Sequence, residues 1–156
     1  MPNLWNRRTR EGEHGFTLVE LLIVVAIVGL ISAIAIPNLL NAVDKAKQKR
    51  SMADMRTIGA AVEAYATDNA RYPIGVTTWP AMKSHLNPHF MKEPPDTDGW
   101  QNGWEVGSVS GDEYTITSTG KDGAASTRSG GPTQVFDCDI LFTNGQFFQW
   151  PQGTQS

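Results

Sequence analysis

One long apolar segment constrains what this chain can fold into more than any other feature of the sequence. Residues Phe16–Leu40 contain a single charged side chain, Glu20, and no Lys, Arg or His. About 20 apolar residues cross the hydrocarbon core of a bilayer as a helix, so the segment predicts a membrane-spanning helix. It is longer than the apolar core of a cleaved secretory signal, which has roughly 7–15 residues. The sequence therefore favours a retained membrane anchor.

The Glu20 carboxylate is the unusual member of this segment. One interpretation is an acid at the headgroup level that reaches water; the other is a functional group. Insertion of a charged residue at the centre of a membrane helix costs about 2.5–3.5 kcal/mol. Cleavage after Gly15 would create an α-amino group on Phe16, which is cationic near neutral pH. We expect that amine, from the same chain or a neighbouring one, to pair with Glu20 and so fix the stagger of bundled helices.

The helix pattern continues well beyond the apolar segment. Pro37 removes one helical hydrogen bond and predicts a kink rather than an end. After it the pattern becomes amphipathic, and we expect one helix from Thr17 to about Asp68. The apolar positions recur mostly at three- and four-residue spacing, at Val43, Ala46, Met52, Met55, Ile58, Val62 and Tyr65.

The remainder of the chain shows turn signals and short β-prone runs. Residues 69–103 are predicted to be a connecting loop with a short helix at Trp79–Leu86. Two hairpins are expected, the second around Asn144-Gly145, the strongest short-range hairpin signal, and 119–133 is a Gly/Ser-rich loop. The predicted strands are Trp104–Val109, Tyr114–Ser118, Ile140–Thr143 and Gln146–Trp150.

These segments predict an α+β fold in which a long N-terminal helix packs on a small antiparallel β-sheet. The expected organisation is a leader at 1–15, a membrane helix at 16–40 and its amphipathic continuation at 41–68. The loop at 69–103 and a sheet region at 104–156 complete it. Lys and Arg nearly balance on the two sides of the membrane helix, so charge alone does not place the sheet region.

Several function classes lose support from composition and spacing. The net charge of −3 gives no electrostatic footprint for nucleic acid. His85 and His89 have the four-residue spacing of a zinc helix, but its glutamate is missing and Pro88 intervenes. Cys138 is the single cysteine, so it forms no disulfide within the chain, and its role and the redox compartment stay open. We predict a protein that is not an enzyme; a signal-anchored enzyme or binding domain is the alternative from another class.

The start of the apolar segment resembles the N-terminal signal of type IV pilins and pseudopilins. The matching residues are Gly15-Phe16-Thr17-Leu18-Val19-Glu20, with Ile36-Pro37-Asn38 further on. The resemblance implies cleavage after Gly15 by a prepilin peptidase and methylation of the Phe16 nitrogen. It also implies a single-pass protein of the bacterial inner membrane, with a cytoplasmic leader and a periplasmic C-terminal domain.

The same resemblance implies partners and a mode of assembly. Phe16, Glu20 and Pro37 would serve assembly into a homopolymeric filament that also contains minor pilins or pseudopilins. An inner-membrane assembly platform would extract the subunits. Asp68–Pro73 resembles the end-of-helix motif of the family, and two further segments, Pro95–Asn102 and Tyr114–Gly123, resemble major pseudopilins of type II secretion. These favour a subunit of a type II secretion pseudopilus over a type IV pilus subunit that serves adhesion, motility or DNA uptake.

A calcium site is the one cofactor that the resemblance implies. Asp137-Cys138-Asp139-Ile140 resembles the acidic run that closes the pseudopilin calcium loop. The implied ligands are Asp122, Asp137 and Asp139, with Ser118 nearby, and calcium takes six to eight oxygen ligands. The alternative, that these aspartates are solvated turn formers, stays equally open.

Overall fold

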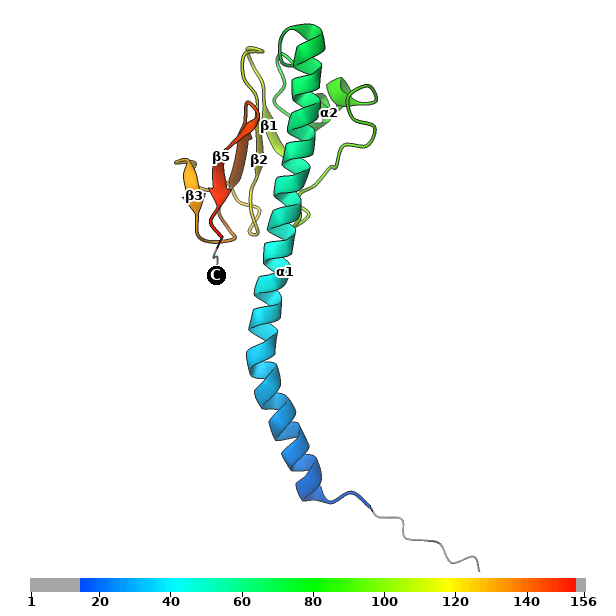
Figure 1. Ribbon diagram of the computed structural model, residues 1–156, viewed down its shortest axis with the longest axis vertical. Coiled ribbons are helices and arrows are strands. Elements are labelled where there is room, and N and C mark those ends of the chain that lie inside the picture. The colour runs from blue at the N-terminus through cyan, green and yellow to red at the C-terminus, as the bar shows by residue number, and fades with distance from the viewer. Residues whose placement is uncertain (1–14, 154–156) are drawn as a thin grey trace, which may run out of the picture. The chain divides into compact units, whose positions relative to one another are not determined.

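The structure is a computed structural model that describes residues 15–153; most of the predicted leader lies outside these residues. The longest element is α1, a helix over Leu18–Asn69, which agrees with the predicted helix to within one residue at each end. Pro37 lies inside this helix, which agrees with the prediction that the proline does not end it. Figure 1 shows α1 as one long helix. The chain divides into two compact units between Leu39 and Leu40.

The first unit carries the apolar part of α1. Within the described residues, this is the one helix long and apolar enough to cross a membrane, with a mean hydropathy of 2.9 over its best window. None of that window is buried. A helix that is apolar on all sides needs lipid or other helices around it, so the unit has the surface expected of a membrane anchor.

The second unit, residues 40–153, which we call the head, uses the rest of α1 as one side of its core. The buried face of this part begins with three polar residues, Asp44, Gln48 and Ser51, and continues with Met55, Ile58 and Val62. Val43 and Ala46, which the sequence pattern placed on the apolar face of this helix, are exposed, so the pattern was wrong at these two positions. Asp44 and Ser51 face inward because residues of distant loops form hydrogen bonds with their side chains.

Five strands form the sheet of the head, in the order β1-β2-β4-β5-β3. Antiparallel pairs join β1 to β2, β2 to β4 and β4 to β5. The remaining strand, β3, lies at an edge of the sheet and pairs in parallel with β5, so the sheet is mixed and not wholly antiparallel as predicted. The bounds are β1 Glu105–Gly107, β2 Thr115–Ser118, β3 Gly131–Thr133, β4 Ile140–Thr143 and β5 Gln146–Pro151.

The core lies between α1, the sheet and the connecting loop. Met55, Ile58 and Val62 of α1 pack with apolar side chains of β2 and β4 and with the short helix α2, Trp79–Leu86. Gly59 allows α1 to approach β4 closely, because a Cβ there would lie 2.3 Å from a Phe142 ring carbon. The predicted short helix is confirmed at the same bounds.

Candidate functional site

The N-terminus of α1 is closed by its own side chains. The Thr17 amide and hydroxyl both donate to Oε2 of Glu20, at 2.9 and 2.8 Å. The Glu20 amide donates in return to the Thr17 hydroxyl at 3.2 Å. This reciprocal arrangement is a capping box, which satisfies backbone donors that the first helical turn leaves free. The carboxylate therefore folds back toward the start of the helix.

Sequence reasoning missed the part played by Thr17, although Thr-x-x-Glu is the sequence signature of a capping box. The predicted pair between Glu20 and the Phe16 amine concerns the cleaved chain and stays a prediction. The geometry is favourable to it, because Glu20 already accepts from the backbone nitrogen of the residue next to Phe16.

Pro37 and its neighbour mark the other end of the predicted assembly segment. Pro37 lies in the interior of α1, and a proline there cannot donate to the carbonyl four residues before it. The side-chain amide of Asn38 donates through Nδ2 to the Ile34 carbonyl oxygen at 3.1 Å, which adds a local hydrogen bond beside the proline. The role of Pro37 in assembly stays a prediction.

In the head, the turn at 98–102 is organised by the buried Asp98 carboxylate. Its Oδ1 accepts from the Trp100 and Asn102 amides, both at 2.9 Å. Its Oδ2 accepts from the Ser118 hydroxyl at 2.5 Å. Gln101 adopts the left-handed backbone conformation, with φ of 74°, which a glycine would adopt without strain. The Ser118 hydroxyl therefore stabilises this turn through its hydrogen bond to Asp98.

Two bonds fasten the same turn to α1. The Gly99 amide donates to the Ser51 hydroxyl at 2.9 Å, and the Trp100 indole donates to Asp44 at 3.2 Å. Asp44 also pairs with Lys121 at 2.9 Å. Burial alone would raise the pKa of Asp44, but the hydrogen bonds from Lys121 and Trp100 lower it. This carboxylate thus joins the helix to both the turn and the loop that follows β2.

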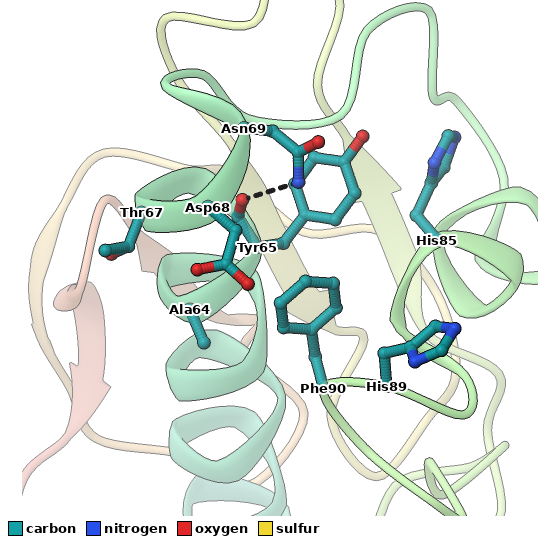
Figure 2. A pocket seen from close by; sticks show the side chains of 8 residues that line it. All are labelled: Ala64, Tyr65, Thr67, Asp68, Asn69, His85, His89 and Phe90. Carbon is teal, nitrogen blue, oxygen red and sulfur yellow. Dashed lines mark hydrogen bonds between the residues drawn. The ribbon is translucent and has the colours of Figure 1, made fainter.

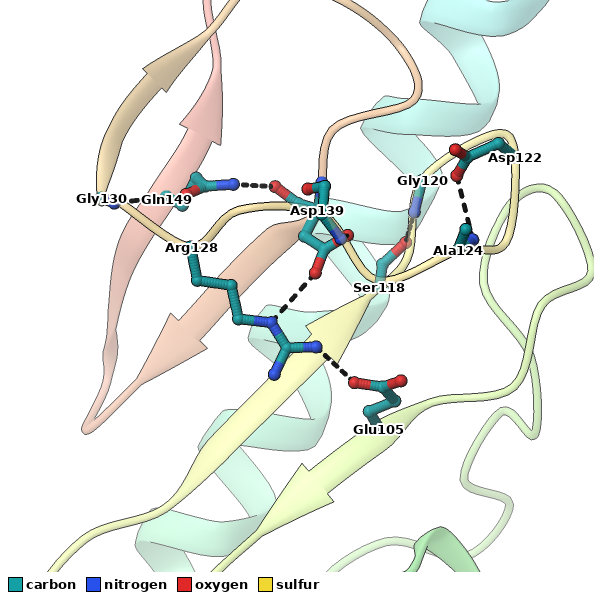
Figure 3. Close-up of polar contacts among 10 residues, drawn as sticks. Glu105, Ser118, Gly120, Asp122, Ala124, Arg128, Gly130, Asp139 and Gln149 are labelled. Atoms are coloured by element: carbon teal, nitrogen blue, oxygen red, sulfur yellow. Dashed lines mark hydrogen bonds and ion pairs between the residues drawn. The ribbon is translucent and has the colours of Figure 1, made fainter.

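The segment between β2 and β4, residues 119–139, which we call the 119–139 loop, includes β3 and holds three of the four predicted calcium ligands. Two of them, Asp122 and Asp139, are labelled in Figure 3, and the fourth predicted ligand, Ser118, is the last residue of β2. Asp122 is exposed and accepts from the Ala124 amide at 3.0 Å, so it caps its own turn. Asp137 is exposed. Asp139 has a fully buried side chain, and each of its two carboxylate oxygens accepts from a nitrogen, the Ser126 amide and Arg128 Nε, at 3.0 Å.

The four predicted ligands do not converge on one point. Ser118 is bound to Asp98, and Asp122 and Asp139 are each committed to nitrogen donors of the loop. Among residues 15–153, no group of three or more His, Cys, Asp or Glu side chains has the arrangement to hold a metal ion. The donor set therefore does not fit calcium, and calcium binding stays a prediction without support from this geometry.

A pocket lies near the C-terminal end of α1 (Figure 2). The Tyr65 ring makes edge contacts with His85 and Phe90, at centroid distances of 5.6 and 5.4 Å. His85 thus packs as an aromatic ring. The pocket is lined by Ala64, Tyr65, Thr67, Asp68, Asn69, His85, His89 and Phe90.

Two family models match this chain, and together they extend from residue 11 to residue 133. The family described as "Type II secretion system (T2SS), protein G" matches residues 38–133. The family described as "Prokaryotic N-terminal methylation motif" matches residues 11–36, which includes the predicted cleavage site. No solved structure matches.

Curated relatives agree with these family matches. The type II secretion system core protein G of Escherichia coli K12 is 27% identical over 88% of this chain and 94% of its own length. The protein of the same name from Aeromonas hydrophila is 31% identical over 74% of this chain and 87% of its own. That from Pseudomonas aeruginosa is 30% identical, over 74% of this chain and 91% of its own. The chain therefore belongs to the protein G family of type II secretion systems, whose members are pseudopilins.

Proposed function

We propose that this chain is a structural subunit of a type II secretion pseudopilus, stored in the membrane and polymerised through the first part of α1. The observation that carries the proposal is the surface of that helix. Its large apolar side chains from Phe16 to Leu40 are between 49% and 87% exposed. Lipid would cover this surface before assembly, and the same helices of neighbouring subunits would cover it in a filament.

Glu20 supplies the register in this proposal. Apolar helices can slide past one another with little change in buried area, whereas an unpaired carboxylate in a low-dielectric surrounding is strongly unfavourable. Pairing with the Phe16 amine of a neighbouring subunit satisfies the charge at one stagger only. The capping box holds the carboxylate at the end of the helix where that amine would arrive.

Maturation and partners follow from the same segment. We infer cleavage after Gly15 by a prepilin peptidase and methylation of Phe16, supported by the match of the methylation motif to residues 11–36. The subunit would span the inner membrane once, with its head in the periplasm. Its partners would be further copies of itself, minor pseudopilins and an inner-membrane assembly platform. The role is structural, as in the family to which the chain belongs.

The test compares Glu20→Ala with a matched loss of negative charge at the exposed Glu113 of the head. Both variants should be present in the membrane fraction at the level of the wild type. Filaments sheared from cells should be lost in Glu20→Ala and unchanged in Glu113→Ala. Equal filament yields from Glu20→Ala and the wild type would refute the role of Glu20 in register.

A further inference from the structure

The buried carboxylate of Asp139 requires a group that compensates its negative charge, and the family resemblance implies that this group is calcium. Asp139 directly precedes β4, and its side chain is fully buried. A buried carboxylate is strongly unfavourable unless a cation or several hydrogen bonds compensate it. Some group must therefore neutralise Asp139 in this fold.

Arg128 is the cation that reaches Asp139. Its Nε donates to Oδ2 of Asp139 at 3.0 Å, and its Nη2 pairs with Glu105 of β1. Figure 3 shows the guanidinium between these two carboxylates. Burial alone would lower the pKa of Arg128, but the bonds to Glu105 and Asp139 raise it. The side chain is therefore a permanent positive charge at this point.

The backbone around Arg128 is fitted to the same contact. The Ser126 amide donates to Oδ1 of Asp139, and the Asp139 amide donates in return to the Ser126 hydroxyl at 2.9 Å. Two residues after Arg128, the Gly130 amide donates to Gln149 of β5 at 3.2 Å. The side-chain amide of Gln149 in turn donates through Nε2 to the Asp139 carbonyl oxygen at 2.8 Å. The loop is thus fastened on both sides of the arginine and leads directly into β3.

We propose that Arg128 takes the place of calcium in this protein, as an internal cation that neutralises Asp139 and fastens the 119–139 loop to the sheet. A calcium ion at Asp139 would need oxygen ligands where the Ser126 amide and the Arg128 guanidinium now present N–H groups. It would also lie beside a fixed positive charge. The fold of the head is then independent of calcium, because its cation is part of the chain.

The first arm of the test uses the full-length wild type in detergent. The midpoint of thermal unfolding should be the same in EDTA, in excess calcium and in excess magnesium, which controls for divalent charge. A ligand that binds only the native state raises the midpoint. A rise of several degrees in calcium and not in magnesium would overturn the proposal.

The second arm replaces the arginine. Arg128→Ala leaves a buried carboxylate without its cation and should lower the midpoint by about 10 °C, whereas Arg71→Ala, at an exposed arginine of the head, should have little effect. The loss from Arg128→Ala should be much smaller in an Asp139→Asn background, because the charge to be neutralised is gone. Equal effects of Arg128→Ala and Arg71→Ala, or full additivity with Asp139→Asn, would overturn the proposal.

If Arg128→Ala does not fold, the comparison of the wild type in EDTA, calcium and magnesium still tests the proposal, because it requires no variant. Thermal unfolding of the head also does not report polymerisation. A negative result here therefore leaves the proposed filament function standing, and that function is tested by filament yield.

Discussion

The contact between the 98–102 turn and α1 allows a sharp prediction for Gly99→Ala. A Cβ at Gly99 would lie 2.1 Å from the Lys47 carbonyl oxygen and 2.7 Å from its carbon. Both atoms belong to the helix backbone, which cannot move aside as the end of a side chain would. The turn must therefore withdraw from α1, and the bond from the Gly99 amide to the Ser51 hydroxyl lengthens or breaks.

The size of the effect follows from these two losses. Overpacking of a close contact costs about 1–3 kcal/mol, and the net contribution of a hydrogen bond is about 0.5–1.5 kcal/mol. Together they predict a loss of about 2–4 kcal/mol in the free energy of unfolding. For a unit of this size the midpoint of thermal unfolding should fall by about 8–16 °C.

The assay is thermal unfolding of the full chain in detergent, followed by tryptophan fluorescence. Trp100 lies within the turn and Trp104 follows it, so their fluorescence reports the exposure of the turn to water. Gly103→Ala is the matched control, because it lies in the same segment and nothing is within 4 Å of its added Cβ. If Gly99→Ala and Gly103→Ala unfold at the same temperature, the turn does not lie against the helix backbone as described, and the reasoning fails.

Three further predictions concern the same part of the head. Gln101→Gly should raise the free energy of unfolding by about 1 kcal/mol in denaturant titration, because glycine adopts the left-handed backbone conformation of this exposed residue without strain. A lower free energy of unfolding in this variant would contradict backbone strain at Gln101. Ser118→Ala should lower it by about 1–3 kcal/mol, equally with and without calcium, since it removes a hydrogen bond from buried Asp98; a loss seen only with calcium would assign Ser118 to a metal. Asp44→Asn should remove part of the acid sensitivity. Because the pKa of folded Asp44 is lowered from 3.8, its contribution is present above that value and disappears as pH falls through the lowered pKa. The difference in unfolding midpoint between wild type and Asp44→Asn should therefore shrink below about pH 4, and a constant difference would refute the assignment.

The features that could be predicted from the sequence are those encoded locally. The bounds of α1 follow from the long apolar run and the amphipathic pattern after it, and from Thr17 and Glu20 at its start. The β4–β5 hairpin follows from Asn144-Gly145, whose φ angles of 46° and 81° are those that a tight hairpin turn demands. In each case a few adjacent residues determine the backbone.

The features that were missed depend on partners far away in the sequence. Asp44 is inward-facing because Trp100 and Lys121 reach it, 56 and 77 residues further on, and no pattern within the helix indicates this. Similarly β3 has three residues and includes Pro132, so it lacks any strand signal of its own and exists because β5 offers it an edge. The sequence does not pair Arg128 with Asp139, because the composition of a Gly/Ser-rich loop does not reveal which of its side chains fold inward.

The central claim is that Glu20 and the cleavage site act together, so that maturation creates the charge that assembly requires. The most direct measurement is intact-mass and peptide mass spectrometry of the protein purified from cells that carry the secretion system. The mature chain is predicted to begin at N-methylated Phe16, and Gly15→Val should retain the leader and form no filaments. A wild-type chain in filaments that still begins at Met1 would contradict the account.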